Sequence, residues 1–206
     1  MASADLDVAD HEVRDSWSRI DAWLTSRCRP APARPAADDA RLAAVEAELR
    51  VALPAELRAW WRLTGIRADF WIPEVFAPMS LDDALETREI WLLVADEEGP
   101  AVDGNGVPEP RFLPELLPIA MSAGGDGLVV DLRAGESHGA VFLWDHEQWG
   151  LGVPMWASIG AMLQDVAVAL ETGAPALRGQ AALGGAEAPR LAVIDASGYL
   201  NWQAAH

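Results

Sequence analysis

The side chains most suited to chemistry gather in one stretch of the sequence, LPIAMSAGGDGLVVDLRAGESHGAVFLWDHEQW, at residues 117–149. Its carboxylates include Asp126, Asp131, Asp145 and Glu147. Two carboxylates that meet in space can serve as the acid and the base of a hydrolase. No nucleophile elbow, phosphate-binding loop or dinucleotide fingerprint accompanies them in the sequence. We therefore predict no catalytic residues and keep a carboxylate-based hydrolase as an alternative.

The tripeptide Asp145, His146 and Glu147 also contains residue types that bind metal ions. A metal site needs three or four ligands that converge on one point. Side chains alternate between the two faces of a strand, so Asp145 and His146 should point in opposite directions. Asp145 and Glu147 should share a side. The pattern predicts no metal ion and no cofactor.

The segment SAGGDG, residues 122–127, separates two apolar runs and predicts a hairpin turn. Its glycines supply the positive φ values that tight hairpins require. Asp126 should accept a hydrogen bond from the backbone two residues further on, as aspartates do in turns. The glycines and Asp126 are therefore interpreted first as turn chemistry.

The elements that must position these residues follow from apolar periodicity and from capping residues. Helices are predicted at 10–27, 38–50, 54–64 and 80–98 and from Ser158 to Gly173. Strands are predicted at 115–122, 126–133 and 138–147, and a hairpin at 190–202. Residues 96–110 are acidic and rich in Gly and Pro, which predicts a surface loop.

The predicted hairpin of residues 126–147, with Arg133 near His138, has two apolar faces. One face carries Leu128, Val130, Leu132, Val141 and Leu143, and the other carries Val129, Asp131, Phe142 and Trp144. Both faces need cover. We expect helices on one face and irregular segments, or a partner, on the other.

The charge balance excludes some partners and favours others. Fifteen Arg and no Lys stand against 32 acidic residues, a net charge of -17. Phosphate binding draws on clustered cations, so neither nucleic acid nor an anionic membrane is expected as a partner. A strong negative charge speeds encounter with a basic protein.

The sequence also bears on the cellular compartment. Cys28 is a single cysteine, so an internal disulfide is not possible. The first residues lack the basic and apolar regions of a signal peptide. No apolar run approaches the roughly 20 residues that span a bilayer. These features predict a cytoplasmic protein.

The aromatic residues suggest where a partner would bind. The chain has 10 Trp and one Tyr, and most of these large rings should lie in the core. Trp149 stands among acids and glycines, where an exposed aromatic anchor is expected. The candidate protein-binding residues are Asp126, Trp144, Asp145, Glu147, Trp149 and Trp156.

The order of two motifs resembles a known family. LPAELRAWWRLTG at residues 53–65 precedes LPIAMSAGGDGLVVDLRAGESHGAVFLWDHE at 117–147, and a Ser-started amphipathic helix follows. This order, over residues 17–173, resembles the SUKH superfamily and its Smi/Knr-type, cell-wall-assembly-regulator-like branch. The resemblance implies an α+β domain whose central, mainly antiparallel sheet carries packed helices. It also implies that most of the matching positions determine the fold, namely Trp60, Trp61, Gly65, Pro118, Gly125, Gly127, Gly139 and Val141.

The resemblance also implies a binding role without chemistry. Bacterial members are largely immunity proteins that neutralise polymorphic toxins, often nucleases, and fungal relatives are regulatory scaffolds. We therefore expect a non-catalytic immunity protein with a basic toxin domain as partner, and a regulatory scaffold as the alternative. The predicted segments are an N-terminal helix and connector at 1–36, a SUKH-like domain at 37–174, and a linker with a C-terminal hairpin at 175–206.

Overall fold

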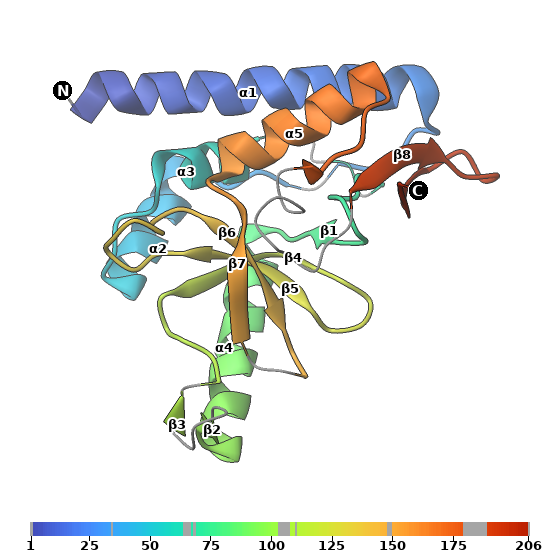
Figure 1. The fold of residues 1–206 in the computed structure, drawn as a ribbon. Coiled ribbons are helices and arrows are strands. Elements are labelled where there is room, and N and C mark those ends of the chain that lie inside the picture. Colours follow the sequence, from blue (N-terminus) through green and yellow to red (C-terminus); the bar gives the residue numbers. More distant parts are fainter. Residues whose placement is uncertain are drawn as a thin grey trace.

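The structure is a computed structural model that describes residues 2–33, 35–63, 67, 69–102, 108–109, 111–147, 150–178 and 189–205. A five-stranded sheet lies between two helical layers. Helices α1 (Ala2–Arg27) and α5 (Ile159–Thr172) pack side by side on one side of it, and α4 (Leu81–Glu98) lies on the other (Figure 1). The predicted α+β class with helices packed on a central sheet is confirmed.

Every pairing in the five-stranded sheet is antiparallel, and the strand order is β1-β4-β5-β6-β7. Its strands are β1 (Ala77–Pro78), β4 (Leu116–Met121), β5 (Gly127–Asp131), β6 (Val141–Asp145) and β7 (Gly150–Trp156). Two separate hairpins accompany it, β2 (Ala101–Val102) with β3 (Pro108–Glu109) and β8 (Arg190–Ile194) with β9 (Leu200–Ala204). The C-terminal hairpin was predicted at this place.

Most helices begin and end at the predicted capping residues. Asp38 accepts a hydrogen bond from the backbone N–H of Arg41 before α2 (Asp39–Leu49), and α3 (Ala55–Arg62) starts directly after Pro54. Ser80 forms a capping box with Asp83 at α4. Ser158 caps α5, which ends at Gly173 in the left-handed region. These contacts satisfy backbone groups that helix ends would otherwise leave unpaired.

Helix α1 differs from its predicted extent because it begins at Ala2 and not at Asp10. Asp10 lies inside the helix and forms an ion pair with Arg14 one turn later. This i,i+4 pair is a typical helix-surface interaction, so Asp10 does not act as the cap. Among the described residues, no helix combines the length and the apolar character needed to cross a membrane.

One hydrophobic core joins all three predicted segments of the chain. Val13, Trp17, Ile20 and Leu24 bury the inner face of α1. The Trp17 ring meets Trp60 edge to face, with centroids 6.5 Å apart. Leu200 and Trp202 of β9 enter the same core. The N-terminal helix and the C-terminal hairpin therefore pack against the central domain.

The second face of the sheet has its own smaller core, and the predicted register is confirmed. Leu128 pairs with Leu143 and Val130 with Val141. Val129, Phe142 and Trp144 therefore lie on the opposite face. Helix α4 covers that face with Trp91, Leu92 and Ala95, and Phe112 and Leu113 complete the cover. The prediction that irregular segments or a partner would cover it missed the contribution of α4.

Three further differences concern element boundaries. Strand β7 was not predicted, and β6 ends at Asp145 although a strand was expected through residue 147. Residues 96–110 were predicted to be a surface loop, yet β2 pairs with β3 there, while α4 ends at Glu98 as the predicted helix does. Gly65 and Trp149 lie outside the described residues.

Candidate protein-interaction surface

The turn between β4 and β5 is held by the buried Ser122. Its hydroxyl oxygen accepts the backbone N–H groups of Gly124 and Asp126, both at 3.2 Å. Its own N–H donates to the carbonyl oxygen of Asp126 at 2.8 Å. Because Ser122 satisfies the turn from inside, the carboxylate of Asp126 is left to bind another segment.

That other segment is the start of the β6–β7 turn. Oδ1 of Asp126 accepts the backbone N–H of His146 at 3.2 Å and lies 2.7 Å from His146 Nδ1. The prediction that Asp126 would close its own turn is therefore wrong. A Cβ at Gly125, where φ is +102°, would lie 3.4 Å from the imidazole ring. The positive φ is therefore what favours glycine at this position, because a Cβ would meet the ring at an ordinary contact distance.

Asp145 and His146 do not point in opposite directions, so the prediction that their side chains would lie on different faces of a strand is wrong. Strand β6 ends at Asp145, so the period of two does not extend to His146. Ligand atoms of Asp126, Asp145 and His146 all lie within 4.8 Å of one another. Oδ1 of Asp145 also accepts the N–H of Glu147 at 2.8 Å. We call Asp126, Asp145 and His146 the turn cluster.

The turn cluster contains residue types that can bind a divalent cation, two carboxylates and one imidazole. Three protein ligands would leave one position of a tetrahedral shell open. A cation placed between them would have to replace the 2.7 Å contact between His146 Nδ1 and Asp126. In its hydrogen-bonded form the cluster instead braces two turns and presents negative charge.

The hydrogen bond to Asp126 raises the pKa of His146 above its ordinary value, and the neighbouring carboxylates act in the same direction. Attraction to an anionic partner favours the protonated imidazole. The ring is partly exposed. A proton on His146 thus reduces the negative charge of the turn cluster as the pH falls.

Burial removes two tryptophans from the expected contact surface. Trp144 is 1% exposed, its Nε1–H donates to the Arg111 carbonyl oxygen at 3.3 Å, and its ring stacks 3.9 Å from Trp91. Trp156 is 7% exposed and donates to Asp165 Oδ2 at 3.0 Å. Trp144 lies on the face that α4 covers, so it belongs to the second core.

The carboxylates named at the outset do not all meet. Asp131 is fully buried at the far end of β5 from Asp126, and it forms an ion pair with Arg133 at 2.7 Å. The Arg133 backbone N–H also donates to Asp131 Oδ1. Asp131 therefore has a structural partner, and the hydrolase alternative loses one of its four carboxylates.

The residues expected to determine the fold occupy demanding positions. A Cβ at Gly127 would lie only 2.4 Å from Cη2 of Trp91, so this position accepts nothing larger than glycine without movement. Gly139 has a φ of +85°, and the β4–β5 register shifts just after Pro118. Trp60, Trp61 and Val141 are buried in the main core.

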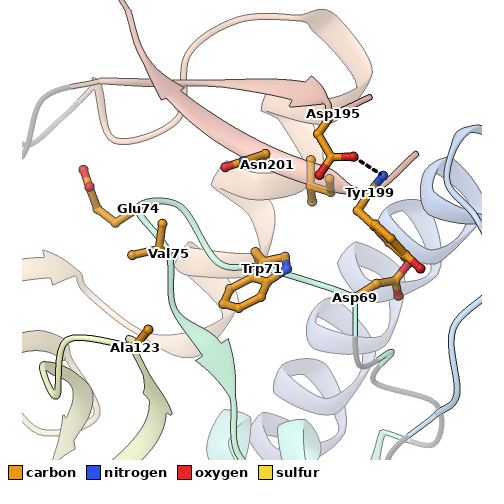
Figure 2. A pocket seen from close by; sticks show the side chains of 9 residues that line it. Asp69, Trp71, Glu74, Val75, Ala123, Asp195, Tyr199 and Asn201 are labelled. Atoms are coloured by element: carbon orange, nitrogen blue, oxygen red, sulfur yellow. Dashed lines mark hydrogen bonds between the residues drawn. The ribbon is translucent and has the colours of Figure 1, made fainter. Parts of the chain in front are cut away.

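A pocket beside the C-terminal hairpin was missed by the sequence analysis. It has a volume of about 580 Å³ and lies between that hairpin, residues 69–75 and the β4–β5 turn (Figure 2). Its walls come from three segments that are far apart in the sequence, so no local motif marks it. We call it the hairpin pocket.

The sequence comparison settles the family of this arrangement. The sequence model of the SMI1 / KNR4 family (SUKH-1) matches residues 36–165 of the 206-residue chain. The chain belongs to the SMI1/KNR4 family. No curated protein matches it. The SUKH-1 match takes in the sheet and both turns of the turn cluster, whereas α1 and the β8–β9 hairpin lie outside it.

Proposed function

We propose that this SUKH-1 protein is a binding domain without chemistry of its own, an immunity protein that neutralises a toxin domain by direct contact. The observation that carries the proposal is the turn cluster. Asp126 and His146 lock two turns of the family domain together, and Asp145 lies beside them at the surface.

Charge supports a basic partner. The chain carries a net charge of -17, and the half-buried Asp145 and the exposed Glu147 flank His146 at the end of β6. Complementary potentials raise association rates and discriminate against wrong partners. A basic toxin surface, such as the substrate cleft of a nuclease, has the complementary sign. We expect the partner to be encoded by a neighbouring gene.

The test is a binding titration between this chain and the toxin domain encoded next to it, at low and at high salt. Asp145→Arg combined with Glu147→Arg should raise the dissociation constant about tenfold at low salt and flatten its salt dependence. Glu136→Arg, an exposed charge reversal at the other end of the β5–β6 hairpin, is the matched control and should change affinity little.

Unchanged affinity of the double variant at both salt concentrations would refute the role of these carboxylates. If the neighbouring genes encode no toxin and pull-downs yield a non-toxin regulatory protein, the chain is a scaffold of the cell-wall-assembly-regulator type. Circular dichroism of each variant separates lost binding from lost folding, which matters because Asp145 also holds the Glu147 N–H.

A further inference from the structure

The hairpin pocket is built from three segments that meet only in the folded chain. Figure 2 shows side chains of the β8–β9 hairpin facing those of the segment before β1, with the β4–β5 turn at the rim. Its lining includes Trp71, Glu74, Val75, Ala123, Asp195 and Tyr199. A volume of about 580 Å³ falls within the range of pockets that enclose small ligands or projecting side chains.

The pocket walls are fixed in place before any ligand arrives. Nε1 of Trp202 donates to the Trp71 carbonyl oxygen at 2.8 Å, which ties the hairpin to the opposite wall. Glu74 forms an ion pair with Arg190 between the same two segments. The Arg29 N–H donates to the carbonyl oxygen of Gly198 at 2.9 Å. A preformed pocket avoids the entropy cost of ordering its walls on binding.

The pocket acids differ in how well they are neutralised. Asp69 receives a two-pronged contact from Arg67, with both hydrogen bonds at 2.9 Å, and Glu74 has Arg190. Oδ1 of Asp195 accepts only backbone N–H groups, from Ser197 at 2.8 Å and Tyr199 at 3.0 Å. Among the described residues, no cation pairs with Asp195. One uncompensated carboxylate therefore lies at the edge of the pocket.

Aromatic and apolar groups line the same pocket as this carboxylate. Tyr199 is 37% exposed and Val75 is 50% exposed, and the half-buried Trp71 lies between them in the pocket. Aromatic faces attract cations, and a guanidinium can stack on a ring while it bonds a carboxylate. The methylenes of an arginine also gain from apolar contact. This combination suits arginine better than an anion or a neutral polar group.

We propose that the hairpin pocket receives an arginine side chain from a loop of the partner protein. The proposal rests on the proposed function, because it names the feature of the basic partner that this surface recognises. Ala123 and Asp126 belong to the same β4–β5 turn, so the pocket adjoins the turn cluster. A partner that contacts the turn cluster can therefore place an arginine between Tyr199 and Asp195.

The first experiment needs no partner. The full chain labelled with nitrogen-15 is titrated with N-acetyl-arginine amide and, in parallel, with the neutral isostere N-acetyl-citrulline amide. Saturable shifts should be confined to the Trp71 indole and to the backbone around residues 195–201. Citrulline should bind at least about fivefold more weakly, since it offers no charge to the carboxylate or the rings.

Two variants and two controls locate the binding. Asp195→Asn removes the charge and keeps the oxygen that accepts the turn N–H groups, and Ala123→Trp fills the pocket. Both should weaken arginine binding about fivefold or more. Glu136→Gln and Ala134→Trp make the same changes at exposed positions of the β5–β6 loop and should have no effect. Equal shifts with citrulline, or shifts unaffected by Asp195→Asn, would overturn the proposal.

The second experiment separates this inference from the proposed function. The dissociation constant of the toxin domain should rise about tenfold with Ala123→Trp and stay unchanged with Ala134→Trp. If the toxin domain binds the wild type and both variants equally, the pocket has no role and the proposed function stands. If the pocket selects arginine over citrulline but the toxin domain does not bind, the proposed function is wrong and the preference of the pocket for a cation is upheld.

Discussion

The contact between His146 and Asp126 links two turns through a single titratable pair. Hydrogen bonding to Asp126 raises the pKa of His146, so the folded state holds its proton more tightly than the unfolded chain does. The stabilising contribution of the protonated pair is complete below the ordinary histidine pKa of 6.5 and is lost as the pH rises through the raised value. The link between the turns is therefore firmest under mildly acidic conditions.

Proton NMR of the imidazole ring tests this directly. We expect the pKa of His146 to lie above 6.5 in the wild type and to fall toward that value in Asp126→Asn, which removes the charge but keeps an acceptor for the His146 N–H. His146→Gln assigns the resonance. The same pKa in Asp126→Asn and in the wild type would mean that the carboxylate does not hold the proton.

The roles of single residues were only partly predictable from the sequence. The contact between Asp126 and His146, for example, depends on β6 ending at Asp145. The sequence correctly indicated a turn at residues 122–127, but it could not show that Ser122 would satisfy that turn and release Asp126. Trp144 looked like part of an aromatic rim, yet its strand face is covered by a helix. Such outcomes depend on tertiary contacts that carry no local signal.

The packing of α4 on the sheet depends on a close approach between Trp91 and β5. A Cβ at Gly127 would lie 2.4 Å from Cη2 of Trp91. Trp91 packs on Trp144 at 3.9 Å and Phe112 at 5.2 Å, measured between ring centroids, so a movement of Trp91 would disturb these contacts. The glycine therefore sets how closely the helix approaches the strand.

Gly127→Ala should lower the free energy of unfolding by about 1–3 kcal/mol through overpacking. Gly124→Ala is the matched control, since its Cβ would meet only Ser122 Oγ at an ordinary 3.5 Å. In urea unfolding, Trp91→Phe should make the Gly127→Ala change less costly, giving a coupling of about 1 kcal/mol. Additive effects of the two substitutions would contradict the steric explanation.

Elements with strong periodicity and caps were predicted well, and elements without them were not. The caps at Asp38, Ser80 and Ser158 were all visible in the sequence. Strand β7 contains Gly150, Gly152 and Pro154, residues that normally interrupt a strand, and its pairing with β6 has two irregularities. It forms because β6 supplies a ready partner, which a local pattern does not reveal.

At the scale of the whole molecule, segments outside the SUKH-1 match help to build the core. Trp202 is 6% exposed, and its ring nitrogen is bonded to the Trp71 carbonyl oxygen. At the other end of the chain, Trp17 of α1 is buried in the same core and meets Trp60 of the matched region edge to face. The family domain is thus extended at both ends by packed structure.

Trp202→Ala should therefore cost about 3–5 kcal/mol of unfolding free energy, because it empties a large buried volume. The exposed neighbour on the same strand, Gln203, provides the control, and Gln203→Ala should stay within about 0.5 kcal/mol. Chemical denaturation followed by far-ultraviolet circular dichroism measures both. A small loss for Trp202→Ala would mean that the hairpin is an appendage whose removal the domain tolerates.

Helices cover both faces of the central sheet, so most side chains of its strands are buried in one of the two cores. Substitutions of these side chains would disturb the packing. The exposed side chains of the two turns at the sheet's end, such as Ala123 and Glu147, take no part in that packing. Substitutions there cost little stability. A few replacements at these turns can therefore change what the surface binds, while the packed sheet beneath them stays the same.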